Sequence, residues 1–239
     1  MNKTTWVISG ASSAIAREFG HLAASKGHPL ILIARDAAEL KIMAADYALR
    51  YKIPCQTIVF DFANDSKTLC HQLFSRQENL SLFLAHSLII ENHDLNESDI
   101  GLVIKVNITS SCELIHGYLK KEQSDHQLIF LSSVAASRGR SKNSLYGASK
   151  SAIETYLQGL QQSASPTQTL TIMRLGFIDT TQTFGKPGIF YASSPKDCAK
   201  ACFKALDRKK RLSYHPFFWR YIMAIISNLP FFIYKKMKM

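Results

Sequence analysis

The chain has 239 residues, of which 46% are hydrophobic and 20% charged, a composition that favours one globular domain with a full core. Its formal net charge is +11, and the last 37 residues carry nine Lys or Arg side chains against one acid. Basic residues interleaved with large apolar side chains favour an anionic membrane surface. The rest of the chain is close to neutral and offers no basic surface for nucleic acid, so we do not expect nucleic acid as a partner.

The cysteines and the N-terminal residues indicate the compartment in which the protein works. The five cysteines show no CxxC spacing, so we expect free thiols in a reducing compartment and no metal site. The first strand is expected by Thr5, with no apolar run behind a basic start, so no cleavable signal peptide is predicted. We therefore expect a cytoplasmic protein, either free or peripheral on the inner face of the cytoplasmic membrane.

The first expected elements are a strand, a turn of small residues and a helix. The strand covers residues 5–9, and the helix runs to about Lys26. Backbone N–H groups in such a turn and the positive end of the helix dipole both face an anion. The pattern predicts a phosphate cradle built from these residues: Gly10, Ser12, Ser13, Ala14 and Ile15.

Strands and helices alternate through the rest of the chain. Further strands are expected at 28–34, 56–60, 81–85, 128–131, 169–175 and 212–215. Helices are expected at 36–51, 65–75, 98–119, around 146–150 and from 195. The alternation predicts a single α/β domain, a Rossmann-like doubly wound parallel sheet with helices on both faces. Ligands of such sheets bind beyond the carboxyl ends of the strands, where these residues fall: Gly10, Arg35, Asp61, Ala85, Ser133 and Gly176.

A candidate catalytic set follows the fifth strand. Tyr146 and Lys150 lie four residues apart on one helix face, and Ser133 precedes Tyr146 by thirteen residues. A phenol can protonate a carbonyl oxygen, a nearby ammonium should lower the phenol pKa from about 10, and a hydroxyl can hold the developing charge. The Tyr-x-x-x-Lys spacing alone is weak evidence, because Tyr234 and Lys238 repeat it in the tail, where we assign no chemistry.

Together these motifs resemble the short-chain dehydrogenase/reductase family along almost the whole chain. The family motif Thr-Gly-x-x-x-Gly-x-Gly corresponds to residues 9–16, with Ala14 and Ala16 in place of two glycines. The resemblance implies an NAD(P)-dependent oxidoreductase that acts on CH–OH groups, most often as a homo-oligomer. It implies four catalytic residues: Asn107, Ser133, Tyr146 and Lys150. Beyond the cradle, it implies these cofactor contacts: Arg35, Asp61, Ala85, Tyr146, Lys150, Gly176, Ile178 and Thr180.

Departures from the family pattern bear on function. The two alanines should weaken cofactor binding without abolishing it. Residues 85–87 read Ala-His-Ser where the family has Asn-Ala-Gly, which puts His86 near the cofactor. A structural or surface role for His86 is favoured over a catalytic acid. Leu175 stands in place of a proline next to the expected nicotinamide position.

The end of the second strand predicts the choice of cofactor. NAD-selective enzymes of this fold usually carry an acid there, which bonds the ribose hydroxyls. In this chain Arg35 takes the place, and a guanidinium can hold a 2′-phosphate. Asp36 is expected to cap the next helix together with Glu39. We therefore predict NADP(H) in preference to NAD(H).

The chain is expected to divide into a cofactor-binding domain, residues 1–213, and an apolar, basic tail, residues 214–239. A helix over 216–229 would be about 21 Å long, too short for a bilayer core of about 30 Å. We expect an amphipathic helix on a membrane surface, with packing on its own domain or on a dimer mate as the alternative. Its apolar face should hold Phe218, Ile222, Ile225 and Leu229.

The tail and the residues after the sixth strand also resemble the reductases of keto-pentose units on polyprenyl phosphate. That resemblance implies a lipid-borne ketone as substrate, with an anionic membrane surface as partner.

The main hypothesis is an NADP(H)-dependent carbonyl reductase. In it Tyr146 protonates the carbonyl oxygen, which Ser133 orients. Lys150 binds the ribose and lowers the Tyr146 pKa, and Asn107 holds a water that relays protons to Lys150. The alternative is a membrane-associated, cofactor-binding scaffold without turnover, motivated by the altered glycine and proline positions. The complete catalytic set argues against that alternative.

Overall fold

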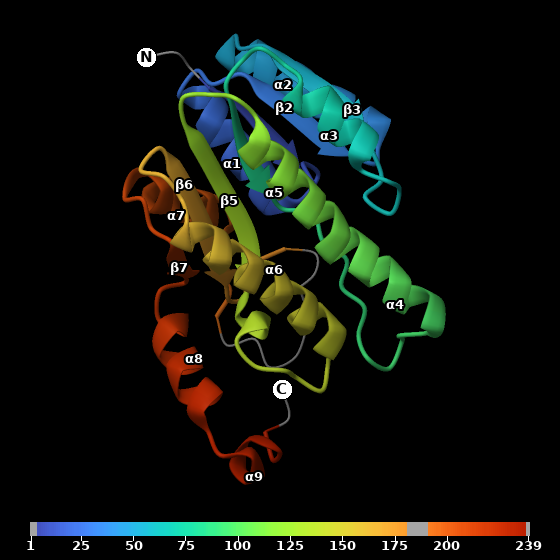
Figure 1. The fold of residues 1–239 in the computed structure, drawn as a ribbon, viewed down its shortest axis with the longest axis vertical. Helices are drawn as coiled ribbons and strands as arrows, with labels where there is room; N and C mark the ends of the chain where they lie inside the picture. Colours follow the sequence, from blue (N-terminus) through green and yellow to red (C-terminus); the bar gives the residue numbers. More distant parts are fainter. Residues whose placement is uncertain (1–3, 181–190, 238–239) are drawn as a thin grey trace.

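Seven parallel strands form one sheet, in the order β3-β2-β1-β4-β5-β6-β7, within the residues that this computed structural model describes, 4–180 and 191–237 (Figure 1). The strands are β1 (Thr5–Ser9), β2 (Leu30–Ala34), β3 (Cys55–Val59), β4 (Leu80–Leu84), β5 (His126–Ser133), β6 (Gln168–Leu175) and β7 (Leu212–His215). Every neighbouring pair is parallel, so all carboxyl ends meet at one edge. The chain order reverses between β1 and β4, which is where ligands bind in such sheets. The predicted doubly wound α/β sheet is confirmed.

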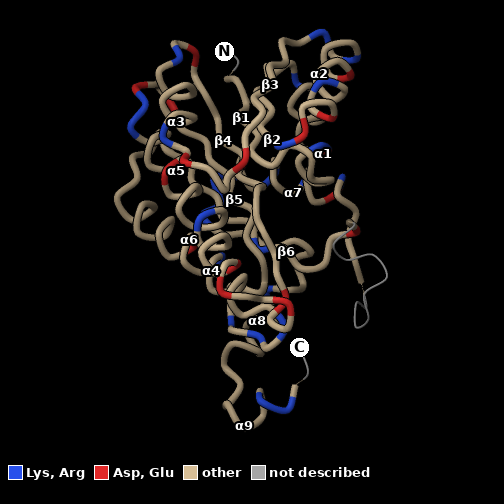
Figure 2. The backbone as a smooth tube through the Cα atoms, turned by 90° about the vertical axis from the view of Figure 1, so that its right-hand side faces the viewer, with Lys and Arg blue, Asp and Glu red and all other residues tan. Residues whose placement is uncertain are grey.

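Helices cover both faces of this sheet. Figure 2 shows α1 (Ala14–Ser25), α2 (Ala37–Tyr51) and α7 (Pro195–Asp207) on one side, and α3 (Lys67–Phe74), α4 (Glu97–Ile104), α5 (Ser110–Lys120) and α6 (Ser144–Gln162) on the other. Side chains of β1 alternate between the two layers. Trp6 and Ile8 belong to the core under α1 and α7, whereas Val7 belongs to the core under α5 and α6. A strand buried on both faces reads as a continuous apolar run, as β2 does, whereas the edge strand β3 is largely exposed.

Short-range signals set where two of the helices begin. Asp36 caps α2 by accepting the N–H of Glu39 at 2.9 Å, as predicted. The Glu39 carboxylate does not return to the cap but pairs with Arg17 of α1. Ser194 caps α7, and Pro195 follows it at the first helical position, where its missing N–H costs nothing.

Two elements differ from the sequence prediction. β5 is longer than the predicted 128–131, because its ladder with β6 runs from His126 to Ser133. The single helix expected over 98–119 contains a π-helical turn, Lys105–Thr109, between α4 and α5. Such turns are often found at functional sites, and this one carries Asn107.

The C-terminal tail packs beyond the carboxyl ends of β5 and β6. α8 (Trp219–Asn228) and α9 (Phe231–Tyr234) follow β7 and project from that end of the molecule (Figure 1). α8 buries Trp219, Met223 and Ile226 against Val134, the residue directly after β5. Among the described residues, no helix combines the length and the apolar character that crossing a bilayer requires.

The buried face of α8 is not the apolar face that the sequence predicted. Ile225, which the prediction grouped with Phe218 and Ile222, is 66% exposed. The apolar arc of this amphipathic helix is wider than the predicted face and extends to Trp219, Met223 and Ile226. Contact with Val134 selects the stripe that carries Trp219, and the opposite apolar side chains stay in solvent.

Candidate active site

A cavity of about 820 Å³ lies at the carboxyl edge of the sheet. It collects all thirteen residues that the sequence assigned to the cofactor: Gly10, Ser12, Ser13, Ala14, Ile15, Arg35, Asp61, Ala85, Tyr146, Lys150, Gly176, Ile178 and Thr180. Ser133 lines the cavity as well, whereas Asn107 does not. The fold thus brings the predicted residues together, and their individual roles stay predictions.

Gly10 shapes the turn between β1 and α1. Its φ is +64°, and a Cβ there would lie 2.6 Å from the backbone nitrogen of His86. The N–H of Ser13 donates to the Gly10 carbonyl at 3.0 Å, and the Ser13 hydroxyl caps α1 by accepting the N–H of Ala16 at 3.2 Å. A tight turn without a side chain, followed by a helix N-terminus, offers backbone N–H groups to an anion. It therefore fits the pyrophosphate of a dinucleotide, although α1 begins with Ala14 instead of glycine.

Two arginines line the part of the cavity formed by β2 and α1. Arg35 is exposed directly after β2. Arg17 of α1, which the sequence reading did not single out, lines the same cavity and pairs with Glu39. The sequence feature that could have identified Arg17 is its position in the first turn of the helix that follows the glycine turn. Across from them, the Asp61 carboxylate accepts the N–H of Ala63 at 2.9 Å, which fixes the turn after β3.

The first turn of α6 brings the catalytic candidates together. Tyr146 and Lys150 lie four residues apart on a buried face of this helix. A Cβ on Gly147 would lie 2.8 Å from the carbonyl oxygen of Ala135, so glycine lets the helix approach the chain that leaves β5. Ala135 comes two residues after Ser133, whose hydroxyl accepts the N–H of Ala135 at 3.1 Å.

Burial dominates the protonation of both residues on this face. It raises the pKa of Tyr146 to about 12, and a hydrogen bond with Ser133 and the charge of Arg140 oppose the rise. Burial lowers the pKa of Lys150 to about 7, and its Nζ donates to the carbonyl oxygen of Leu131 at 2.8 Å. The expectation that Lys150 lowers the Tyr146 pKa is wrong in this structure, because the cation acting on the phenol is Arg140.

Asn107 is buried in the π-helical turn beside α6. Its Oδ1 accepts the N–H of Leu88 at 2.7 Å, and its Nδ2 donates to the Leu88 carbonyl at 2.8 Å and to Ser149 Oγ at 3.0 Å. Ser149 in turn donates to the Tyr146 carbonyl at 2.8 Å. These bonds make Asn107 a positioning residue for the catalytic helix. The relay water expected at Asn107 stays a prediction.

His86 joins three elements beneath the cavity. Its Nδ1 lies 2.7 Å from Ser9 Oγ, and its Nε2 lies 3.0 Å from Ser110 Oγ and 3.2 Å from Ser111 Oγ. The ring stacks on Phe62 with 3.8 Å between centroids. Burial lowers the pKa of His86 to about 3, so the ring is neutral at physiological pH. These contacts support the structural role that the sequence favoured, and that role stays a prediction.

A buried polar network behind α6 was missed from the sequence. The Glu154 carboxylate accepts from Ser132 Oγ at 2.5 Å and from Arg174 Nε at 2.9 and 3.0 Å. A second nitrogen of Arg174 donates to the Tyr214 hydroxyl at 2.6 Å. The network ties α6 to β5, β6 and β7. Its sequence signal was that Glu154 extends the four-residue spacing of the catalytic face beyond Lys150.

A parallel sheet of this order, with a glycine turn after β1 and a tyrosine and lysine on the helix after β5, defines a dinucleotide-binding oxidoreductase. A model of the short chain dehydrogenase family matches residues 4–186, and the chain belongs to this family. The predicted family and enzyme class are thereby confirmed.

Individual relatives are distant. An uncharacterized oxidoreductase of Staphylococcus saprophyticus is 24% identical over 216 residues, which cover 87% of this chain and 92% of that protein. The bulky-bulky ketone specific alcohol dehydrogenase from Comamonas testosteroni has a similar structure, with a TM-score of 0.83, 18% identity and 96% of each chain covered. A short-chain dehydrogenase from Sphingobium yanoikuyae, solved in complex with NADPH, gives a TM-score of 0.80 at 19% identity over 95% of this chain and 96% of that one. At such identities these structures show the common fold.

Proposed function

We propose that the protein is an NADP(H)-dependent carbonyl reductase that converts a ketone to an alcohol. The observation that carries this proposal is the meeting of Ser133, Tyr146 and Lys150 at the cavity that the Gly10 turn also lines. The same groups serve the reverse oxidation, because a proton donor in one direction is the acceptor in the other.

The dinucleotide, when bound, supplies or accepts the hydride. Tyr146, with a pKa of about 12, is protonated at neutral pH and donates its proton to the carbonyl oxygen. Ser133 donates a hydrogen bond to the same oxygen as negative charge develops there. The Lys150 ammonium lies 5.8 Å from the centre of the Tyr146 ring and titrates near pH 7, which suits a group that returns a proton to the phenol. Its second role is to hold the ribose.

Preference for NADP(H) follows from the charges at the β2 end of the cavity. Arg35 and Arg17 both line that end and suit a 2′-phosphate. The nearest acid after β2 is Asp36, whose carboxylate accepts the N–H of Glu39 at 2.9 Å. An acid used as a helix cap is not available to bond the ribose hydroxyls of NAD.

The substrate we propose is a lipid-borne ketone, such as a keto-sugar on polyprenyl phosphate, met at an anionic membrane surface. The support is the tail, where five large apolar side chains are at least 60% exposed: Phe217, Tyr221, Ile225, Phe231 and Phe232. Lys235 and Lys236 are exposed beside them. Apolar side chains that insert and lysines that attract anionic headgroups together suit peripheral attachment.

Oxidation of NADPH by the full-length protein in the presence of a panel of ketones, including sugar and lipid-borne ketones, tests the reductase. Turnover should fall by a factor of about 10² or more in Tyr146→Phe, with NADPH binding unchanged. Tyr156→Phe, ten residues further along α6, is the matched control and should keep its activity. NADPH oxidation that does not depend on Tyr146, or no oxidation with any ketone by protein that binds NADPH, would instead support the scaffold alternative.

A further inference from the structure

The loop between β5 and α6, residues 137–143, gathers buried polar atoms that lack hydrogen-bond partners. Three such atoms within the described part of the chain belong to this loop: Ser137 Oγ, Arg140 Nε and Asn143 Oδ1. Folded proteins leave few buried polar atoms unpaired, so three in seven residues call for an explanation. The Arg140 Nε–H can donate, the Asn143 Oδ1 can accept, and the Ser137 hydroxyl can do either, so a ligand with both kinds of group could pair with all three.

Arg140 is the charged member of this cluster. Its side chain is partly buried, and in residues 4–180 and 191–237 the groups that act on its charge are two tyrosines and no carboxylate. The remaining residues contain no Asp or Glu. A partly buried guanidinium without a carboxylate is costly unless an anion comes from outside the chain.

The neighbouring arginine shows what a structural role looks like in this loop. A guanidinium nitrogen of Arg138 donates to the carbonyl oxygens of Ile226 and Leu229 at 2.5 and 2.7 Å. Its guanidinium also lies 3.9 Å from the centre of the Tyr234 ring. Arg138 therefore fastens the tail to the loop, whereas Arg140 has no such partners among the described residues.

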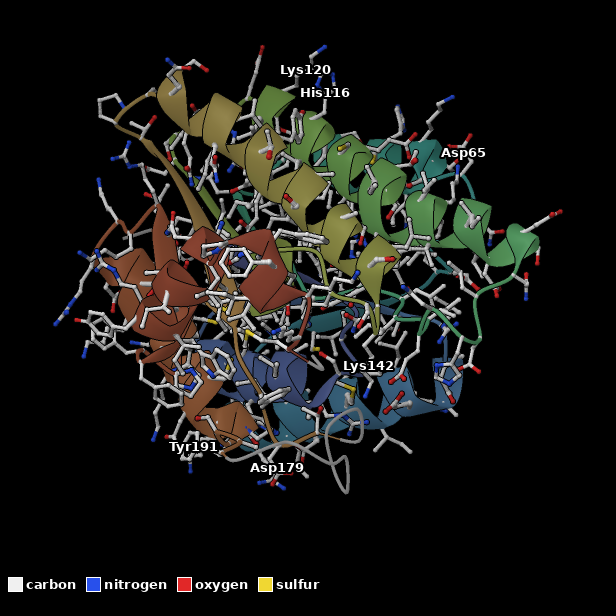
Figure 3. All side chains as sticks on the ribbon, turned by 90° about the horizontal axis from the view of Figure 1, so that it is seen from below. Asp65, His116, Lys120, Lys142, Asp179 and Tyr191 are labelled. Carbon is white, nitrogen blue, oxygen red and sulfur yellow. The ribbon has the colours of Figure 1, made fainter. Side chains whose placement is uncertain are left out.

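Arg140 lies six residues before the proton donor. Its positive charge is one of the influences that oppose the rise in the Tyr146 pKa. The loop leads directly into α6, of which Tyr146 is the third residue, and Tyr146 lines the cavity. Figure 3 looks onto this end of the molecule and labels Lys142 of the loop. A ligand group bound in this loop would thus lie on the segment that leads into the catalytic helix.

We propose that residues 137–143 form an anion-binding subsite for the substrate, in which Arg140 and Ser137 donate to a phosphate or carboxylate and Asn143 accepts from a hydroxyl. The subsite rests on the proposed reductase function and narrows its substrates to anionic, hydroxylated ketones. Guanidinium N–H and hydroxyl O–H groups suit the acceptor-only oxygens of such an anion.

An anion at Arg140 also acts on the proton donor. It compensates the positive charge that favours the ionised phenol, so the Tyr146 pKa stays high while such a substrate is bound. The protonated phenol is the form that gives a proton to the carbonyl oxygen. Binding of the anion therefore also keeps Tyr146 in the protonated form that can donate to the carbonyl oxygen.

Calorimetric titration of full-length, NADPH-saturated protein tests the subsite without any turnover. The probes are glycerol 3-phosphate, glycerate and uncharged glycerol, none of which carries a carbonyl. The wild type should bind one or both anions and not glycerol, and the stronger of the two identifies phosphate or carboxylate as the group. Arg140→Gln should weaken anion binding at least about tenfold, and Arg140→Lys should weaken it less. Arg211→Gln, which removes an equal charge before β7 at the opposite edge of the sheet, should bind like the wild type.

Reduction of dihydroxyacetone phosphate and dihydroxyacetone supplies the second readout. Arg140→Gln should raise KM for the phosphorylated ketone about tenfold or more, with KM for dihydroxyacetone and the Kd of NADPH unchanged. The subsite is wrong if the wild type binds neither anion, if Arg211→Gln loses as much affinity as Arg140→Gln, or if Arg140→Gln weakens NADPH itself. Anion binding without reduction of any ketone would instead overturn the reductase and leave the subsite standing.

Discussion

Glu154 of α6 and Arg174 of β6 form a buried ion pair in which Arg174 Nε lies 3.0 and 2.9 Å from the two carboxylate oxygens. Glu154 is 2% exposed, and Ser132 donates to the same carboxylate. Because Glu154 shares a helix face with Lys150, its bond with Arg174 fixes the catalytic helix against β6, and its bond with Ser132 fixes it against β5, the strand that carries Ser133.

Arg174→Met should lower the free energy of unfolding by about 3–5 kcal/mol, because it leaves the Glu154 carboxylate buried without a cation. The midpoint of urea unfolding measures the loss. The double variant Glu154→Leu/Arg174→Met should recover most of it, since apolar side chains can replace a buried ion pair. Arg211→Met removes an exposed arginine and should leave the midpoint unchanged. A double variant no more stable than Arg174→Met would contradict this account.

The stability should depend on pH through Lys150. The folded chain releases the Lys150 proton near pH 7, whereas the unfolded chain holds it up to about 10.5. Between these values the unfolded chain binds more protons, so the stability contribution of this site rises with pH, by up to about 1.4 kcal/mol per unit. Lys150→Met removes this dependence.

Urea unfolding of wild type and Lys150→Met at pH 7, 8 and 9 measures this difference, because the tyrosines and cysteines that also titrate are common to both chains. The wild type should gain stability relative to the variant as pH rises. Lys41→Met, on the exposed face of α2, is the control and should run parallel to the wild type. Parallel curves for Lys150→Met would mean that Lys150 stays charged in the fold.

Arg35→Ala should weaken NADPH far more than NADH. If the guanidinium holds the 2′-phosphate through charge-assisted bonds, the Kd of NADPH should rise by about thirtyfold or more, and that of NADH should barely change. Quenching of protein fluorescence during titration measures both constants. Arg50→Ala, an exposed arginine at the end of α2, is the control. Equal weakening of both dinucleotides would make Arg35 a loop residue without a role in selectivity.

Membrane attachment should depend on three exposed apolar side chains, Phe217 shortly before α8 and Tyr221 and Ile225 on that helix. The wild type should sediment with vesicles that contain phosphatidylglycerol, and less so at high salt, because the lysine contribution is screened. The triple variant Phe217→Ser/Tyr221→Ser/Ile225→Ser should stay in the supernatant. Ile42→Ser and Leu49→Ser together remove exposed apolar side chains from α2 and should not change sedimentation.

Removing the whole tail is a poorer test of attachment. Truncation after Leu212 would also delete Trp219, Met223 and Ile226, which pack on Val134. Loss of vesicle binding by such a chain could follow from damage to the fold. Unchanged sedimentation of the α8 triple variant, in contrast, would directly contradict the attachment of this face.

The parallel α/β sheet and the meeting of the predicted site residues at one edge followed from the sequence, because both depend on local patterns. Apolar runs and turns gave the alternating elements, and parallel pairing put Gly10, Arg35 and Ser133 at one edge. The cap at Asp36 was predictable for the same reason, since donor and acceptor lie three residues apart.

What the sequence could not give are contacts between distant segments and the effects of burial. Glu154 and Arg174 are twenty residues apart and meet only because β6 lies beside α6. The pKa of Lys150 depends on the depth of its burial, which a motif does not contain. The orientation of α8 depends on which part of its wide apolar arc fits Val134, a contact between distant segments.

The tail holds the loop that precedes α6 at three points, the first of which is a hydrogen bond from Ser227 Oγ to the Ser137 carbonyl at 3.4 Å. Arg138 donates to the Ile226 and Leu229 carbonyl oxygens, and the Tyr234 hydroxyl donates to the Gly139 carbonyl at 2.5 Å. A partner that bound α8 and α9 and shifted them would therefore shift this loop through the same bonds. Linkage makes the effect reciprocal: the factor by which such a partner raises affinity for substrate is the factor by which substrate raises affinity for that partner. The C-terminal helices thus give the active site a means of cooperating with whatever the tail binds.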